Sequence, residues 1–140
     1  MDAEKRTAIV WAALNGHLAA VKHLIQRRVD PCTFDGTGTR PIHWAAGYGH
    51  VGVLKHLLTL RCLDAASTQD GSGQSPLSWA ARLGRERCAE MLLGHRADVT
   101  LADKQDRLTA SHWAARHGHD SVLRLLLKHH AAPQVRAADG

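Results

Sequence analysis

Residues Arg40 to Leu58 read R-P-I-H-W-A-A-G-Y-G-H-V-G-V-L-K-H-L-L, and this stretch recurs three more times along the chain. The other copies run from Thr7 to Ile25, from Ser75 to Leu93 and from Thr109 to Leu127. Each copy keeps Trp-Ala-Ala and places a glycine five residues after the tryptophan. The tryptophans, residues 11, 44, 79 and 113, follow one another at steps of 33, 35 and 34 residues. This regular period predicts an array of repeated structural units.

Each copy carries the signals of two short helices. In the first copy, Ala8 to Leu14 predicts a helix ended by Gly16, because glycine readily takes the left-handed turn conformation. A second helix is expected to open at His17, since the apolar residues that follow recur at helical spacing. These apolar positions are Leu18, Val21, Leu24 and Ile25.

The starts of the units also follow a pattern. Thr7 and the pair Ser75-Pro76 predict helix starts, as does Pro41, because proline suits the first helical position. The sequences D-G-T-G and D-G-S-G, at residues 35–38 and 70–73, predict turns between units. The fourth unit has one residue inserted in K-Q-D-R-L and lacks a turn glycine, so its turn is expected to be the least regular.

A period near 33 with T-P-L-H-x-A-A, then G-H, then an apolar run ending in L-L, resembles the ankyrin repeat. The most specific matches are residues 41–46 with Gly49-His50, and residues 112–115 with Gly118-His119. The resemblance implies an all-α solenoid of stacked helix-turn-helix units with β-hairpin-like turns. It makes residues 2–136 a single domain of four repeats, at about 2–34, 35–69, 70–102 and 103–136, and makes residues 137–140 the start of a fifth. A longer array is therefore expected.

Composition narrows the class of partner. The 140 residues are 44% apolar and 22% charged, as in an ordinary soluble domain. The formal net charge of +5, with 11 histidines beside it, favours an acidic protein partner. No Lys/Arg-rich run occurs, so nucleic-acid binding would rest on net charge alone and is not expected.

The cysteines and the hydropathy of the chain indicate its location in the cell. Cys32, Cys62 and Cys88 are odd in number and form no C-x-x-C, so a disulfide framework is not expected and free thiols would suit a reducing compartment. The N-terminus lacks the apolar core of a signal peptide, and no apolar run is long enough to span a bilayer. The expectation is a cytoplasmic or nuclear protein that makes no membrane contact.

The repeated aromatic and histidine side chains allow structural and functional interpretations. A tryptophan ladder along the first helices would serve repeat-to-repeat packing or, as the alternative, form an aromatic binding strip. The resemblance gives His43 and His112 the role of tying a first helix to its cap, and His17, His50 and His119 the role of opening a second helix. Their spacing does not favour a metal site.

One position departs from the ankyrin pattern. The family usually places glycine after the second helix, but the aligned residues here are Arg28, Arg61, Arg96 and His130. A positive charge at a helix C-terminus is one explanation. The other is a basic stripe, reinforced by Arg27 and His95, that docks on an acidic surface.

The resemblance places partner binding on the concave face, at the hairpin tips and the exposed ends of the first helices. The residues carried over to that face are Arg6, Asn15, Thr39, Tyr48, Gln74, Arg82, Leu83, Arg107, Arg116 and His117. The sequence holds no catalytic motif, so a cofactor-free, monomeric protein-binding module is expected rather than an enzyme. A stoichiometric enzyme inhibitor and the targeting arm of a larger enzyme or membrane protein are the alternatives.

Overall fold

A computed structural model describes residues 7–60 and 65–129 of the chain. The described residues form eight α-helices and one short 3₁₀ helix and contain no β-strand, which confirms the all-α prediction. The helices are α1 Ala8–Leu14, α2 Leu18–Gln26, α3 Pro41–Gly47, α4 Val51–Thr59, η1 Ala65–Ser67, α5 Pro76–Leu83, α6 Glu86–Gly94, α7 Ala110–Arg116 and α8 Asp120–Lys128.

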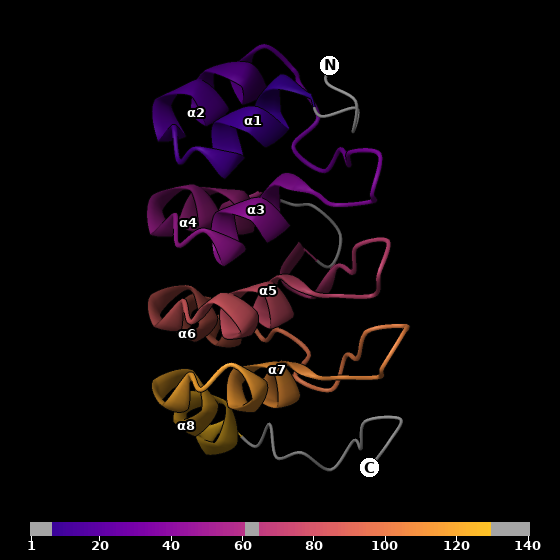
Figure 1. Cartoon of the computed structure of the whole chain (residues 1–140). Helices are drawn as coiled ribbons and strands as arrows, with labels where there is room; N and C mark the ends of the chain where they lie inside the picture. The colour runs from indigo at the N-terminus through magenta and orange to yellow at the C-terminus, as the bar shows by residue number, and fades with distance from the viewer. Residues whose placement is uncertain (1–6, 61–64, 130–140) are drawn as a thin grey trace.

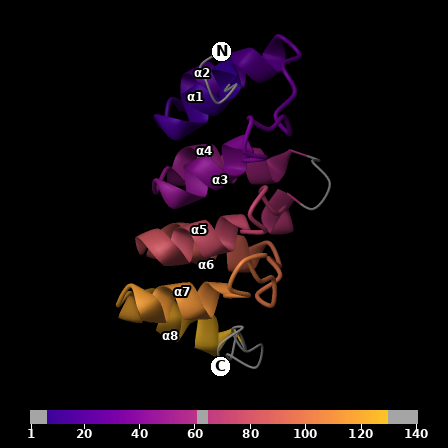
Figure 2. The ribbon, with the colours of Figure 1, turned by 45° about the vertical axis from the view of Figure 1, so that its right-hand side comes forward.

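The helices form antiparallel pairs stacked along one axis (Figure 1). The odd-numbered helices make one column, in which α1 packs on α3, α3 on α5 and α5 on α7. The even-numbered helices make a second column, and the connecting loops project from the other side of the odd-numbered helices (Figures 1 and 2). Helices of seven to nine residues are unstable alone in water, so each depends on its neighbours in the stack.

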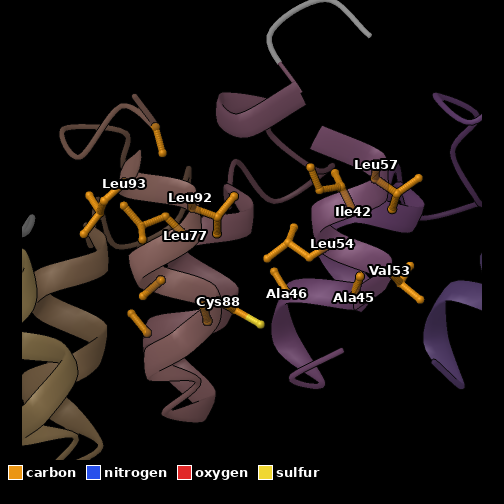
Figure 3. Packing of buried hydrophobic residues seen from close by; sticks show 14 of the residues in the cluster. Ile42, Ala45, Ala46, Val53, Leu54, Leu57, Leu77, Cys88, Leu92 and Leu93 are labelled. Carbon is orange, nitrogen blue, oxygen red and sulfur yellow. The ribbon is translucent and has the colours of Figure 1, made fainter. Parts of the chain in front are cut away.

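A continuous apolar core runs between the pairs. Figure 3 shows Leu54 and Ala46 of the second pair facing Leu77 and Cys88 of the third. Leu54 and Leu77 are completely buried, and Ala46 is small enough to let neighbouring helices approach closely. Truncating such a leucine to alanine typically costs about 2–5 kcal/mol. The core therefore belongs to the interfaces between repeats rather than to single repeats.

The turn inside each pair has the predicted glycine. Gly16, Gly49, Gly84 and Gly118 all adopt left-handed backbone angles, with φ between 71° and 76°. The ring of His50 lies directly over Gly16 of the preceding repeat, where an added Cβ would be 2.5 Å from the ring. His50 Nε2 donates to the carbonyl of Leu14 at 2.9 Å, and so joins the first two repeats. His17, His50 and His119 are the residues before α2, α4 and α8, as the resemblance implied.

The loops between pairs are hairpin-like and are joined to one another by hydrogen bonds. The Asp35 N–H donates to the Thr39 carbonyl at 2.9 Å, and the Asp70 N–H donates to the Gln74 carbonyl at 2.8 Å. Neighbouring hairpins are then linked, since Gly71 N–H donates to the Thr37 carbonyl at 3.1 Å. These bonds hold the hairpins in a fixed register above the odd-numbered helices.

The fourth hairpin shows the predicted irregularity. The Asp103 N–H bonds the Leu108 carbonyl at 3.0 Å, one residue further along than in the other hairpins. Arg107 takes the left-handed place of the missing glycine, with φ of 59°. Thr7 precedes α1 as predicted, but its hydroxyl makes no capping hydrogen bond, whereas the Ser75 hydroxyl accepts from Ser78 N–H at 3.1 Å.

The cysteine prediction is wrong for one residue. Cys32 is disulfide-bonded, so the three cysteines are not all free thiols. Cys88 is a free thiol, and burial raises its pKa. Cys62 lies outside the described residues. The cysteines therefore no longer argue for a reducing compartment. Within the described ranges, no helix is long and apolar enough to cross a membrane.

Candidate partner-binding surface

The C-terminal ends of the odd-numbered helices form a row of positions along the stack, and most of their side chains are exposed or half-buried. We call the surface made by these helix ends and the hairpins the concave face. Within each repeat, two positions on this row follow the tryptophan by three and four residues. The third positions are Leu14, Gly47, Arg82 and Arg116, and the fourth positions are Asn15, Tyr48, Leu83 and His117. The row is therefore neutral over α1 and α3 and basic over α5 and α7.

Hairpin aspartates orient the tryptophans beneath this row. The Trp79 indole N–H donates to Asp70 Oδ2 at 3.0 Å, and Asp70 Oδ1 accepts from the Ser72 and Gln74 N–H groups. The Asp70 carboxylate therefore joins its hairpin to α5, the helix that follows it. Sequence reasoning assigned the aspartates only to turns, although the recurrence of aspartate nine residues before Trp44 and Trp79 was a visible signal.

Asp35 occupies the same place in the second repeat. Burial would raise the pKa of its carboxyl, but hydrogen bonds from the Thr37 hydroxyl, the Thr37 and Thr39 backbone and the Trp44 indole together lower that pKa. In the fourth repeat the geometry differs. Trp113 Nε1 and Asp103 Oδ2 are both buried and have no hydrogen-bond partner among the described residues. Asp103 stands ten residues before Trp113, whereas Asp70 stands nine residues before Trp79.

Tryptophan rings contact one another between α3 and α5, and arginines lie against the tryptophan rings of α5 and α7. The rings of Trp44 and Trp79 meet edge to face with their centroids 5.1 Å apart. The Arg82 guanidinium then lies 5.0 Å from the Trp79 ring centroid and 5.6 Å from that of Trp113. The Arg116 guanidinium is also 5.6 Å from the Trp113 centroid. The predicted ladder is thus continued by Arg82, and the contact between Trp44 and Trp79 supports its role in packing repeats together. The aromatic binding strip stays a prediction.

Gly47 explains why the second repeat contributes no arginine to this row. An added Cβ at Gly47 would be 2.7 Å from Trp79 Cε3, so any side chain there would displace the Trp79 ring. The indole of Trp79 occupies the space that a side chain of α3 would otherwise need. The close packing of Trp79 against α3 therefore disfavours any side chain at residue 47.

A hollow of about 270 Å³ lies between the hairpins and α3 and α5. Its lining includes Thr39, Gln74, Trp79 and Arg82. Thr39 and Gln74 were predicted to contact a partner, but only 3% and 9% of their surfaces are exposed. The exposure expected of them is wrong because both residues, which directly precede the N-cap of a helix, are buried against the hollow. They support the hollow's wall, and Gln74 Oε1 has no hydrogen-bond partner there.

The remaining predicted residues lie where a partner could reach them. Tyr48 is 45% exposed and rests edge-on against Trp44, and Leu83 is 36% exposed. His117 is exposed and stacks on Trp113 with ring centroids 5.7 Å apart. Asn15 is exposed at the end of α1, where its amide donates to the Trp11 carbonyl at 2.9 Å.

Two predicted residues lie at or beyond the edges of this surface. Arg107 is exposed in the fourth hairpin, at the left-handed position described above, and its N–H donates to Asp103 Oδ1 at 3.0 Å. Its backbone role is therefore structural, while its side chain is accessible. Arg6 lies outside the described residues.

The basic stripe lies at the ends of the even-numbered helices, apart from the concave face. Arg28 and Arg96 are exposed and take left-handed angles, with φ of 66° and 61°, where the family pattern has glycine. Arg61 and His130 lie outside the described residues. The left-handed conformation expected at a glycine position is therefore adopted by arginine in both repeats.

The histidines that were assigned structural roles have the matching contacts. Nδ1 of His43 accepts the Arg40 N–H, and Nδ1 of His112 accepts the Thr109 N–H, both at 3.0 Å. His119 Nε2 donates to the Arg82 carbonyl at 3.0 Å. Among residues 7–60 and 65–129, no three His, Cys, Asp or Glu side chains cluster closely enough to hold a metal ion.

Comparison with known proteins identifies the architecture. A family model described as ankyrin repeats (3 copies) matches residues 1–66 and also residues 59–137. A search of curated proteins finds no match. The two matched stretches together span nearly the whole chain, and their helix pairs, hairpins and turn glycines are those described above. The chain belongs to the ankyrin repeat family.

Proposed function

We propose that this chain is a protein-binding module that takes its partner on the concave face, as an adaptor or scaffold. Ankyrin repeats are generally protein–protein interaction modules. The observation that carries the proposal is the row of exposed anchors over α3, α5 and α7. Tyr48, Leu83, Arg116 and His117 are all exposed there, beside the partly exposed Arg82.

The chemistry of this row suits a protein partner. Tyrosine and arginine are enriched among the residues that dominate binding energy at interfaces. Tyr48 is held by its edge contact with Trp44, and Arg82 by two indole rings, so little side-chain entropy would be lost on binding. Recognition would then rest on shape and charge, with the module acting as a monomer and without cofactor or reaction.

Two alternative functions use this same surface and differ in the effect that the module has on its partner. As a stoichiometric inhibitor, the module would cover the active site of an enzyme. As a targeting arm, it would bring an attached enzyme or membrane protein to the partner. Assaying a captured enzyme with and without the module separates them, because only the inhibitor lowers the partner's own activity.

The test is a pull-down from cell lysate with the wild-type module and two variants. The concave-face variant carries Tyr48→Ala, Leu83→Ala, Arg82→Glu and Arg116→Glu. The matched control carries Arg87→Glu and Arg124→Glu, which make the same charge change at exposed positions on α6 and α8. Far-ultraviolet circular dichroism and thermal unfolding establish that all three proteins are folded.

The proposal predicts a partner that the wild type and the control retain and that the concave-face variant loses. Retention of the same partners by all three proteins would contradict it. Loss from the control alone would place binding on the even-numbered helices. In that case the next surface to test would be the basic stripe at Arg28 and Arg96.

A further inference from the structure

The basic half of the concave face has the features of a carboxylate-binding site. We infer that Trp79, Arg82, Trp113 and Arg116 form a clamp for an extended acidic peptide segment of the partner, with carboxylates of Asp or Glu placed against the two guanidinium groups. This clamp rests on the proposed concave-face function and specifies the partner's chemistry. The four side chains come from α5 and α7, two helices that pack against each other.

The arginines are positioned by the indoles. Arg82 contacts the rings of both Trp79 and Trp113, and Arg116 contacts the ring of Trp113. Cation–π contacts of this kind restrain a long side chain that would otherwise move freely. Trp79 is itself held in place by its hydrogen bond to Asp70 in the hairpin. The hairpin therefore helps to position the Arg82 side chain through the Trp79 ring.

Among residues 7–60 and 65–129, neither arginine of the clamp has an acidic partner. In the part of the chain that the structure describes, no carboxylate forms an ion pair with Arg82 or Arg116. The hairpin carboxylates Asp70 and Asp103 are buried, and their Oδ1 atoms accept backbone N–H groups of their own hairpins. The donors of both guanidinium groups therefore stay available for a bidentate carboxylate.

The spacing of the clamp suits an extended peptide. Both guanidinium carbons lie within 5.6 Å of the centroid of the Trp113 ring, so they can be no further apart than twice that distance. In an extended chain, side chains two residues apart point the same way and are separated by about 7 Å. A peptide with acidic residues at alternate positions can therefore reach both arginines.

The difference in charge along the row also determines the orientation in which an acidic segment would bind. Over α1 and α3 the corresponding positions are Leu14 and Gly47, with Trp11 39% exposed and Tyr48 45% exposed nearby. The acidic residues of the partner would therefore lie over α5 and α7, and the neutral or apolar residues over α1 and α3. A nucleic-acid strand carries uniform charge and would not match this gradient.

The test uses a fluorescein-labelled peptide of alternating Glu and Gly, about twelve residues long so that it spans the clamp. The matched probe replaces every Glu by Gln, and a single-stranded DNA oligonucleotide of similar length is the third probe. Fluorescence anisotropy measures binding to the wild type, to Arg82→Gln/Arg116→Gln and to the matched control Arg87→Gln/Arg124→Gln. Arg116→Gln alone is included because Arg116 is exposed on α7 and its loss leaves the core intact.

The wild type should bind the Glu peptide in preference to the Gln peptide and to DNA. Each charged hydrogen-bonding partner removed should weaken binding by roughly 10-fold, so Arg116→Gln should lose about that factor and the double variant more. The control should stay within about 3-fold of the wild type, since its charges lie outside the clamp. Added salt should weaken the wild-type complex.

Several results would overturn the clamp. One is that the wild type binds the Glu peptide no better than the Gln peptide, or binds it without saturation. Another is that DNA binds more tightly through the same arginines. A third is that the Arg87→Gln/Arg124→Gln control loses as much affinity for the Glu peptide as Arg82→Gln/Arg116→Gln does. If the clamp fails while the concave-face variant still loses the lysate partner and the Arg87→Glu/Arg124→Glu control retains it, the concave-face function stands without the clamp. If the Glu peptide binds through Arg87 and Arg124, the clamp fails. If the Arg87→Glu/Arg124→Glu variant also loses the lysate partner, the proposed function fails too.

Discussion

Mild acid should destabilise this fold through one buried histidine. His43 has no exposed surface, and both of its ring nitrogens are used. Nδ1 accepts the Arg40 N–H at 3.0 Å, and Nε2 donates to the carbonyls of Thr68 and Gln74 at 3.1 Å each. Only the neutral ring can make this set of bonds, because a proton on Nδ1 would face the Arg40 N–H.

Burial is the largest cause that lowers the pKa of His43, from 6.5 to about 4. The charge of Asp70 and the bonds to Thr68 and Gln74 oppose the shift, and the charge of Arg40 adds to it. Since the folded pKa is the lower one, the unfolded chain takes up the proton first, and stability falls as the pH drops from about 6.5 towards 4. At 1.36 kcal/mol per pKa unit, the loss between about pH 7 and pH 5 should be about 2 kcal/mol.

Urea unfolding followed by circular dichroism measures this free energy at each pH. The informative variant is His43→Ser, because serine holds the equivalent place at Ser78 in the third repeat. His43→Ser should be less stable than the wild type at neutral pH, yet lose about 2 kcal/mol less on acidification. His23→Gln, at an exposed position on α2, should keep the wild-type pH dependence. Equal slopes for His43→Ser and the wild type would refute the reasoning.

Three further predictions concern stability and are checked by urea unfolding. Trp79→Phe should lower the free energy of unfolding by about 1–3 kcal/mol, because Asp70 Oδ2 loses its indole donor. Trp113→Phe should lower it less, because the Trp113 indole N–H has no partner among the described residues. Equal losses in the two variants would contradict the role given to the Asp70 bond. Arg96→Gly should raise the free energy of unfolding by about 0.5–1 kcal/mol, because a φ of 61° favours glycine. A lower free energy of unfolding would show that contacts of the arginine side chain stabilise the fold by more than the backbone strain costs. Gly47→Ala should cost about 1–3 kcal/mol by displacing the Trp79 ring, and a neutral effect would mean that the ring moves freely.

The helix pairs could be predicted from the sequence because a 33-residue period repeats every local signal several times. A glycine such as Gly49 marks the same turn in each copy, and proline or serine marks the helix start. Where one copy departs from the repeat pattern, as in the fourth hairpin, the sequence shows the inserted residue but not how the hairpin accommodates it. The sequence does not reveal that Arg107 takes the left-handed angle or that Trp113 loses its aspartate partner.

The binding row was harder to predict, because position in a repeat does not determine exposure. Thr39 and Gln74 stand beside the helix start in sequence, yet the hairpin turns them into the wall of the hollow. Nor did the sequence show that Arg82 lies between two indoles, since that contact joins residues from different repeats. The Cys32 disulfide was missed because an odd number of cysteines argued against pairing.

The most direct test of the concave-face claim is hydrogen exchange, measured by mass spectrometry on the module alone and in complex with the partner captured from lysate. Our account predicts slower exchange in the bound module at the hairpin of residues 103–108 and at the C-terminal ends of α5 and α7, with little change in α6 and α8. Protection confined to α6, α8 and the segment around Arg96 would contradict it and place the partner on the opposite side of the stack.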